Sequence, residues 1–180
     1  MLLNSNALTI KFLRNSGNNL LILINQNLLY YTAVHIKLSS LAHSVQLLDI
    51  FAYELPYNSG LKKKNNLTLP ANTVIYNFYA INENQRFFIF IKNQKNKQIF
   101  SNTPLKSVTE LFPNANWLER EVSEMNNIFF LGKRDIRNLL LQYGDTSAPL
   151  KKSFPCVGLR EIFYESLSDT LTQTPISLQF

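Results

Sequence analysis

The feature that most constrains the fold is a pair of strand-like segments joined by a short polar turn. Aromatic and β-branched residues fill positions 74–81 and 86–92, and the four polar residues 82–85 separate them. Segments of this composition favour β-strands, and so short a connection joins antiparallel neighbours. The pattern therefore predicts a β-hairpin within a sheet.

The first two-thirds of the chain alternates helix-like and strand-like segments. The expected elements are helices over residues 2–13 and 36–45 and strands over 20–24, 28–34 and 47–53. A loop rich in Asn and Lys is expected over residues 58–72. Together with the hairpin, these elements predict an α+β fold. It would comprise a mixed sheet with helices packed on one face, then a two-helix motif segment and an extended C-terminal tail.

The first motif helix is expected after Pro113. Asn116 can cap it, with Glu119 three residues later in a capping-box-like arrangement. Arg120 and Glu124 have the i, i+4 spacing of an ion pair on the helix surface. This segment is therefore predicted to begin with an amphipathic helix.

The second motif helix is expected over residues 135–143, with Asp135 as its cap and Gly144 as its natural end. Residues with helical spacing would form its apolar face, namely Ile136, Leu139, Leu140 and Tyr143. From residue 145 onward the chain reads as extended, and a hairpin can pair residues 159–164 with 171–176. We therefore divide the chain into an α/β globular domain (1–112), a helical motif segment (113–144) and an extended tail (145–180). The tail has too little apolar content for its own core, so we expect it to lie on the domain or on a partner subunit.

Composition points to a covered surface. Hydrophobic residues make up 46% of the chain and charged residues only 17%, with a net charge of +6. A surface short of charge is usually covered by something else. The basic residues are dispersed apart from 62–64 and 151–152, whereas a nucleic-acid footprint clusters on one face. Solvated or interfacial lysines are therefore favoured over a phosphate-binding track.

The single cysteine, Cys156, limits the chemistry. One thiol excludes an intrachain disulfide framework and a self-contained iron–sulfur cluster, which takes about four thiolates. Structural zinc needs several Cys or His, and His35 and His43 lack ligand-like spacing to the cysteine. We predict no catalytic, cofactor-binding or metal-binding residue, and we interpret Cys156 as a small buried hydrophobe.

The chain shows no membrane-spanning pattern. No apolar run approaches the roughly 18 to 20 residues needed to cross a bilayer. Lys11 and Arg14 among apolar residues faintly suggest a transit peptide, but the stretch flows into strand-like sequence. We therefore interpret the start as mature protein.

An ordered set of motifs runs from Leu111 to Pro155. The motifs are Leu111-Phe112-Pro113-Asn114-Ala115-Asn116, Trp117-Leu118-Glu119-Arg120-Glu121-Val122, Ile128-Phe129-Phe130-Leu131-Gly132, Asp135-Ile136-Arg137, Leu139-Leu140, Tyr143-Gly144, Pro149-Leu150-Lys151-Lys152 and Phe154-Pro155. In this order and spacing they resemble the thirty-kilodalton subunit family of respiratory complex I (NADH:ubiquinone oxidoreductase). Its members are called the C subunit in bacteria and NADH dehydrogenase subunit 9 when mitochondrially encoded. Thinner matches reach back to about residue 47.

Several positions depart from the family pattern. The family usually has Phe-Gly at Asn126-Asn127, His at Lys133, an acidic residue at Gln142, Gly at Ser147, Arg at Lys151 and Asp at Ser153. Asn127 can adopt a left-handed turn without being glycine, so we expect the helix exit to survive. The changes at Lys151 and Ser153 alter the expected interface ion pairs more than the fold.

The resemblance implies a structural subunit of the peripheral arm, on the matrix side of the mitochondrial inner membrane. Members of the family carry no flavin, cluster or quinone ligand. The domain and tail would brace the large neighbouring subunit (the forty-nine-kilodalton type) that carries part of the quinone pocket, during NADH-to-ubiquinone electron transfer. The chain would thus belong to an enzyme complex without catalytic residues, nucleic-acid partner or membrane span of its own.

The motif residues are expected to act in folding and contact. Adjacent helix positions do not face each other, so the Glu119-Arg120-Glu121 triplet is not a paired-carboxylate active site. We expect Arg120, Glu121, Asp135 and Arg137 to lock the two helices and the tail through charge-assisted hydrogen bonds.

The expected interface extends from that triplet into the tail. Trp117 is interpreted as a core or interface anchor, and Lys151-Lys152 as part of an extended segment lying along an acidic partner surface. The family-motif and interface residues are Trp117, Glu119, Arg120, Glu121, Asp135, Arg137, Tyr143, Gly144, Pro149, Lys151, Lys152, Phe154 and Pro155.

Two other function classes are open to a basic chain of this kind. A basic RNA-binding or ribosomal protein would stack bases on Tyr76, Phe78, Phe88 and Phe90, although aromatic alternation suits a buried sheet face equally well. A stand-alone enzyme is least favoured, because the sequence holds no Gly-rich phosphate loop, metal set or Ser-His-Asp order.

Overall fold

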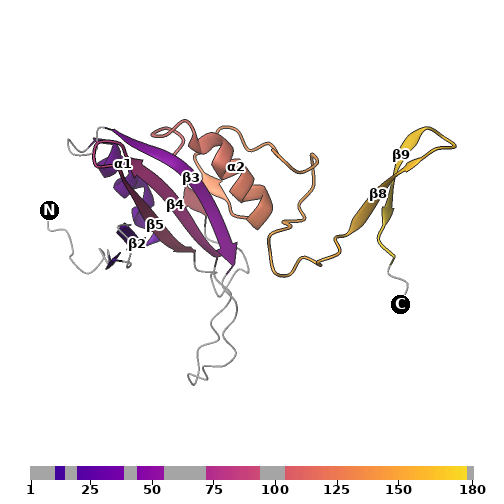
Figure 1. Cartoon of the computed structure of the whole chain (residues 1–180), viewed down its shortest axis with the longest axis horizontal. Coiled ribbons are helices and arrows are strands. Elements are labelled where there is room, and N and C mark those ends of the chain that lie inside the picture. The colour runs from indigo at the N-terminus through magenta and orange to yellow at the C-terminus, as the bar shows by residue number, and fades with distance from the viewer. Residues whose placement is uncertain (1–10, 15–19, 39–43, 55–71, 94–103, 178–180) are drawn as a thin grey trace, which may run out of the picture.

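The computed structural model describes residues 11–14, 20–38, 44–54, 72–93 and 104–177 of the 180-residue chain. Its centre is a five-stranded mixed sheet in the order β1-β2-β5-β4-β3. The strands are β1 (Lys11–Arg14), β2 (Leu20–Ile24), β3 (Val45–Glu54), β4 (Asn72–Ala80) and β5 (Gln85–Asn93). β2 runs parallel to β5, whereas the other neighbouring pairs are antiparallel. The α+β class with a mixed sheet is confirmed (Figure 1).

Two helices and two small sheets complete the described part. A 3-10 turn, Gln26–Leu28, leads into α1 (Leu29–Leu38), and α2 spans Ala115–Asn126. The short strands β6 (Leu105–Lys106) and β7 (Phe130–Leu131) pair in parallel on either side of α2 in the sequence. The last two strands, β8 (Arg160–Glu165) and β9 (Thr170–Pro175), form a hairpin that stands away from the sheet (Figure 1).

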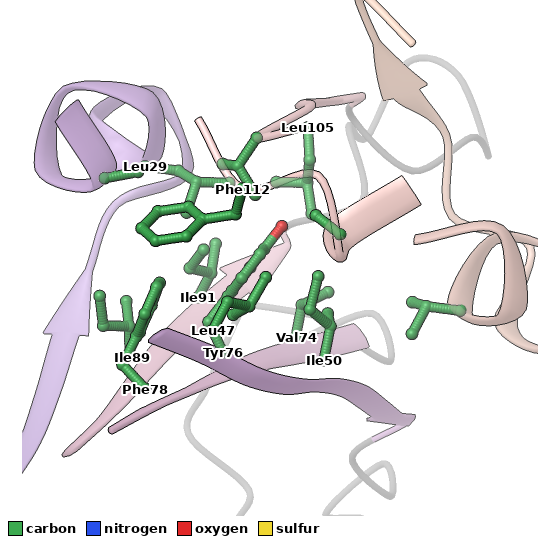
Figure 2. Close-up of a cluster of buried hydrophobic side chains, with 14 of the residues drawn as sticks. Leu29, Leu47, Ile50, Val74, Tyr76, Phe78, Ile89, Ile91, Leu105 and Phe112 are labelled. Carbon is green, nitrogen blue, oxygen red and sulfur yellow. The ribbon is translucent and has the colours of Figure 1, made fainter. Parts of the chain in front are cut away.

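The core lies on one face of the sheet (Figure 2). β4 and β5 pair Val74 with Ile91, Tyr76 with Ile89 and Phe78 with Phe87, so these side chains share a face. Both helices and the β6 region contribute buried apolar side chains above it, namely Leu29, Ala33, Leu105, Val108, Phe112, Ala115 and Val122. Helices on one face of a mixed sheet therefore enclose one continuous core, as the sequence predicted.

The outer edge of β3 is covered by side chains that flank α2. Asn114 Nδ2 donates to the carbonyl of Leu47 at 3.1 Å, and Asn126 Nδ2 donates to that of Ala52 at 3.5 Å. A register shift between Leu47 and Asp49 separates the two sites. Unpaired edge carbonyls template pairing with other chains, and these two amides occupy two carbonyls of β3.

Several sequence predictions are confirmed. The hairpin over residues 74–92 is β4 and β5, the strand at 47–53 lies within β3, and the C-terminal hairpin is β8 and β9. Asn127 ends α2 in the left-handed region, with φ 52°. In each case the local pattern of apolar and turn-forming residues is consistent with the tertiary contacts.

The early helix and strand assignments were partly wrong. Residues 28–34, expected as a strand, belong to the 3-10 turn and α1, and Val45, expected in a helix, begins β3. Residues 11–13 are strand rather than helix. α1 buries Leu29 and Ala33 at i, i+4 spacing, and a short apolar run does not by itself distinguish helix from strand. The expected helix at 2–10, most of the loop at 58–72 and His43 lie outside the described residues.

Candidate functional site

Residues 135–145, here called the strap, run past α2 without regular structure. The second motif helix predicted over residues 135–143 is therefore wrong, and the motif segment contains one helix, not two. The prediction failed although the apolar spacing was helical. The reason lies in two side chains of α2, one turn apart, that occupy the strap's backbone polar groups.

Arg120 holds the first half of the strap. Its Nε donates to the carbonyl of Arg137 at 2.8 Å and its Nη2 to that of Asn138 at 3.0 Å. Its Nη1 lies 3.4 Å from Asp135 Oδ2, and the Trp117 ring covers the guanidinium at 5.5 Å from its centroid. The planar fork satisfies its donors in fixed directions, which lets a charge that is only 8% exposed remain paired.

Glu124 holds the second half. Its carboxylate accepts the backbone N–H groups of Leu139 at 2.9 Å, Leu140 at 2.7 Å and Leu141 at 3.3 Å. Bonds to an ionised acceptor are stronger than neutral ones, so they compete successfully with a helical ladder. The predicted i, i+4 pair of Arg120 and Glu124 is thus replaced by two parallel contacts to the strap.

Asp135 completes the strap's entry. Its carboxylate accepts bonds from Arg137 Nε and Nη2, both at 2.9 Å, and from the Arg137 backbone N–H at 3.2 Å. The side-chain bond from Arg137, with its backbone bond and the charge of Arg120, holds the pKa of Asp135 well below its usual range. Asp135 therefore stays ionised between two guanidinium groups.

A second polar cluster lies on the inner side of α2. Glu119 is fully buried and accepts from Ser107 Oγ at 2.7 Å and the Val108 N–H at 2.8 Å. Lys133 Nζ lies 3.3 Å from Glu119 Oε2 and donates to the Asn116 carbonyl at 2.7 Å. Burial raises the pKa of Glu119, although its hydrogen bonds and Lys133 lower it. The cluster ties the β6 loop, α2 and the segment after β7 together.

The sequence predictions for these residues are borne out only in part. Arg120, Asp135 and Arg137 form one network, but Glu121 is exposed and takes no part in it among the described residues. Glu119 is a buried acceptor rather than a cap, and Asn116, whose carbonyl accepts from Lys133, is not the residue before the helix. Position 114 precedes α2, without a side-chain cap bond.

Two further corrections concern exposure. Cys156 was expected to be buried and is exposed. Trp117 is 60% exposed, so it is not a core residue, and its predicted role in an interface remains a prediction.

Sequence reasoning missed three members of this site. It read Glu124 only as a partner for Arg120, and it gave no role to Lys133 or Ser107. The contacts of Glu124 and Lys133 depend on the return of the chain after β7, and that of Ser107 depends on its approach to α2, so no local pattern contains them. The departure of Lys133 from the family pattern, which usually has His there, was one signal in the sequence.

The tail lies mostly exposed. Lys152 donates its backbone N–H to Glu54 Oε2 at 3.1 Å, and the Leu150 N–H binds the Met125 carbonyl at 3.0 Å. Beyond these attachments Pro155 is exposed, as is every residue of β8. The predicted interface residues Tyr143 and Gly144 are exposed as well, whereas Pro149, Lys151 and Phe154 are half-buried.

The other function classes find less support in the geometry. Tyr76 and Phe78 are fully buried in the core, and the β4–β5 register turns Phe88 and Phe90 to the opposite face. The four aromatic residues therefore form no common stacking surface. Within the described ranges, no group of three or more His, Cys, Asp or Glu could hold a metal ion. In the same ranges, no helix is long and apolar enough to cross a bilayer.

Known proteins similar to this chain include subunits of the family that the motifs resemble. The chain is 34% identical over 105 residues to the C subunit of NADH-quinone oxidoreductase from Ruegeria pomeroyi, covering 58% of this chain and 50% of the relative. It is 36% identical over 105 residues to the mitochondrial NADH dehydrogenase (ubiquinone) iron-sulfur protein 3 of Candida albicans, covering 58% and 36%. The chain thus spans half or less of the length of these relatives.

Solved structures share the fold. A trypsin-resistant fragment (1–134) of Nqo5 superimposes with a TM-score of 0.52 at 23% identity, covering 70% of this chain and 89% of the fragment. A chain of the membrane-bound sulfane sulfur reductase, an archaeal respiratory membrane complex, gives 0.65 at 13% identity, covering 84% and 81%. The model of the family described as respiratory-chain NADH dehydrogenase, 30 Kd subunit, matches residues 23–159, which include β3, β4, β5, both helices and the strap. The chain therefore belongs to the 30 Kd subunit family of the respiratory-chain NADH dehydrogenase.

Proposed function

We propose that this chain is a structural subunit of the peripheral arm of respiratory complex I and carries no redox centre of its own. Family membership supports the complex, and the arrangement of the motif residues supports the structural role. The observation that carries the proposal is the strap: Arg120 and Glu124 direct their charges at backbone groups of the same chain. Charged groups used in this way hold the shape of the segment that they bind.

The tail supports a bracing role against a neighbouring subunit. β8 and β9 form an isolated two-stranded hairpin, and such a unit is marginal in water without a further surface. Leu159, Ile162, Tyr164 and Leu171 are more than half exposed on or beside it. We propose that the large quinone-site subunit of the complex supplies the covering surface. Pro149, Lys151, Lys152, Phe154 and Pro155 would lie along it, with the lysines toward acidic groups.

The proposed location follows from the proposed complex. The Candida albicans relative is described as mitochondrial, and so is the 30.4 kDa subunit of Neurospora crassa, which is 29% identical over 143 residues. We place the chain on the matrix side of the mitochondrial inner membrane as part of this membrane-bound complex. The proposed partition into residues 1–112, 113–144 and 145–180 would then separate a folded base from its contact segments.

The test is to tag the full-length chain in the cells that make it and separate solubilised membranes on a native gel. The proposal expects the chain in one large band with NADH dehydrogenase activity, and a cross-link from the tail to the large quinone-site subunit. A variant lacking residues 159–176 should be absent from that band. Its matched control, in which the exposed turn residues 82–84 are replaced by Gly, should still migrate in the band. Migration with ribosomal particles, or as a monomer, would contradict the proposal and favour the RNA-binding alternative.

A further inference from the structure

The strap presents apolar side chains to solvent although its backbone is fixed. Ile136 is 79% exposed, Leu140 59% and Tyr143 75%. Side chains of this size are ordinarily turned inward when their segment is held against the protein. Here Arg120 and Glu124 of α2 bind the backbone of the strap, whereas its three large apolar side chains remain exposed to solvent. Their exposure therefore follows from the way in which α2 binds the segment.

Several of the strap's backbone hydrogen-bonding groups, most of them in residues 137–142, are used within the chain. Arg120 donates to the carbonyls of residues 137 and 138, and Glu124 accepts from the N–H groups of residues 139–141. Asn138 Nδ2 adds bonds to the carbonyls of Gln142 at 2.8 Å and Asp145 at 3.3 Å. A partner would therefore meet a backbone that α2 holds at residues 137–141, with three exposed apolar side chains around these contacts.

The exposed charged residues near these side chains in the sequence are mostly basic. Residues 133–152 contain five Lys or Arg and two Asp; Lys133 is buried against Glu119, whereas Arg134, Arg137 and Lys152 are exposed. Asp135 is paired with Arg137, and the Arg134 side chain is exposed next to it. A complementary surface would thus be apolar at its centre and acidic at its rim, which is how interfaces combine burial with orientation.

We propose that Ile136, Leu140 and Tyr143 form a preorganised anchor that inserts into an apolar pocket with an acidic rim on a neighbouring protein subunit, and that Arg120 and Glu124 are its positioning residues. The proposal rests on the proposed function and names the contact through which the subunit is held. Fixing the segment before binding removes the entropy cost of ordering it, so a few side chains can dominate the affinity. A lipid surface is less well matched, because fluid acyl chains gain little from a backbone held by seven directional bonds.

The experiment is a competition inside the cell. Tagged full-length chain is made alongside the untagged wild-type chain, and the ratio of the two in the isolated complex is compared with their ratio in the lysate. Tagged wild type should enter without preference. The variant Ile136→Ser/Leu140→Ser should be depleted about tenfold or more, because it removes the apolar area that the two side chains would bury in the pocket. Leu38→Ser, on a side chain 72% exposed at the end of α1, is the matched control and should enter like wild type.

Four further variants separate anchoring from folding. Arg134→Glu should lower incorporation. The control Arg86→Glu, which changes an exposed arginine on β5, should not. Glu124→Ala should lower incorporation and speed hydrogen exchange of the 139–141 amides while those of β4 stay protected. Glu124→Gln, which keeps one acceptor, should recover part of both effects.

A labelling measurement is independent of whether the serine variant folds. In a Cys156→Ser background, Leu140→Cys should react with maleimide in the free chain and be protected in the complex. Equal reactivity in both states, or equal incorporation of wild type and Ile136→Ser/Leu140→Ser, overturns the anchor while leaving the subunit role intact. Failure of the tagged wild-type chain to enter any complex overturns the proposed function itself. Leu140-dependent sedimentation with phosphatidylglycerol vesicles, without protection in the complex, would assign the anchor to a lipid surface instead.

Discussion

Lys133 and Glu119 form a buried ion pair, with Nζ 3.3 Å from Oε2 and both side chains almost completely excluded from solvent. Burial lowers the pKa of Lys133 and raises that of Glu119, so each charge depends on the other and on the hydrogen bonds around it. The pair joins the segment after β7 to the helix that holds the strap. Its integrity is therefore a condition for the geometry of the whole site.

Breaking this pair from one side is expected to be costly. Lys133→Met leaves the Glu119 carboxylate buried without its counter-charge, and Glu119→Gln leaves the ammonium in the same position. Each single variant should lower the free energy of unfolding by about 3 kcal/mol or more. The double variant should cost less than the sum by at least about 1 kcal/mol, because it leaves neither charge unpaired. Urea unfolding of the four full-length proteins gives the cycle, and strictly additive costs would show that the two groups are not coupled.

Arg120 is expected to tolerate no other cation. Arg120→Lys keeps the charge, but one ammonium cannot reach the carbonyls of residues 137 and 138 and Asp135 in the directions that the guanidinium provides. The free energy of unfolding should fall by about 2 kcal/mol. Arg134→Lys, at an exposed position in the same segment, should change it by less than about 0.5 kcal/mol. Equal effects of the two substitutions would remove Arg120 from the role assigned to it.

The strap should loosen in acid through Asp135. Its folded-state pKa lies below its unfolded value, so its contribution to stability is complete above about pH 4 and is lost as the pH falls through the folded pKa. Trp117, the one tryptophan, lies over Arg120 and reports the change by fluorescence.

The wild-type emission should thus stay constant from pH 7 to about pH 4 and change below it. Asp135→Asn should show the altered emission already at pH 7 and little further change on acidification. The same acid transition in both proteins would assign it to another carboxylate.

Tyr76 offers a stabilising substitution. Its side chain is fully buried, and its hydroxyl has no hydrogen-bond partner among the described residues. Burial of an unpaired hydroxyl costs about 1–3 kcal/mol, so Tyr76→Phe should raise the free energy of unfolding by about 1 kcal/mol. Tyr79→Phe is the control, since the Tyr79 hydroxyl already donates to Asn84 at an exposed position. A loss of stability in Tyr76→Phe would show that the hydroxyl does have a partner in solution.

Local pattern was sufficient for the elements whose contacts are local. The hairpin of β4 and β5 follows from alternating apolar residues around a polar turn, and the exit of α2 follows from the tolerance of Asn127 for positive φ. The motif order also identified the family, because it depends on residue identity along one stretch of chain. Even the absence of a thiolate set follows from a single Cys156.

The strap shows what the sequence alone did not contain. Residues 135–143 have helical spacing, yet an isolated short helix is marginal in water, and two charged side chains of α2 offer its backbone stronger partners. Whether Arg120 and Glu124 pair with each other or with residues 137–141 depends on where the chain returns after β7, and that path is set by the parallel contact of β6 with β7 and by the buried Lys133. Sequence thus determined the hairpin at the centre of the sheet, α2 and the family. Only the tertiary structure, through competition for backbone hydrogen bonds, decided that a segment with helical spacing would become an exposed, rigid strap.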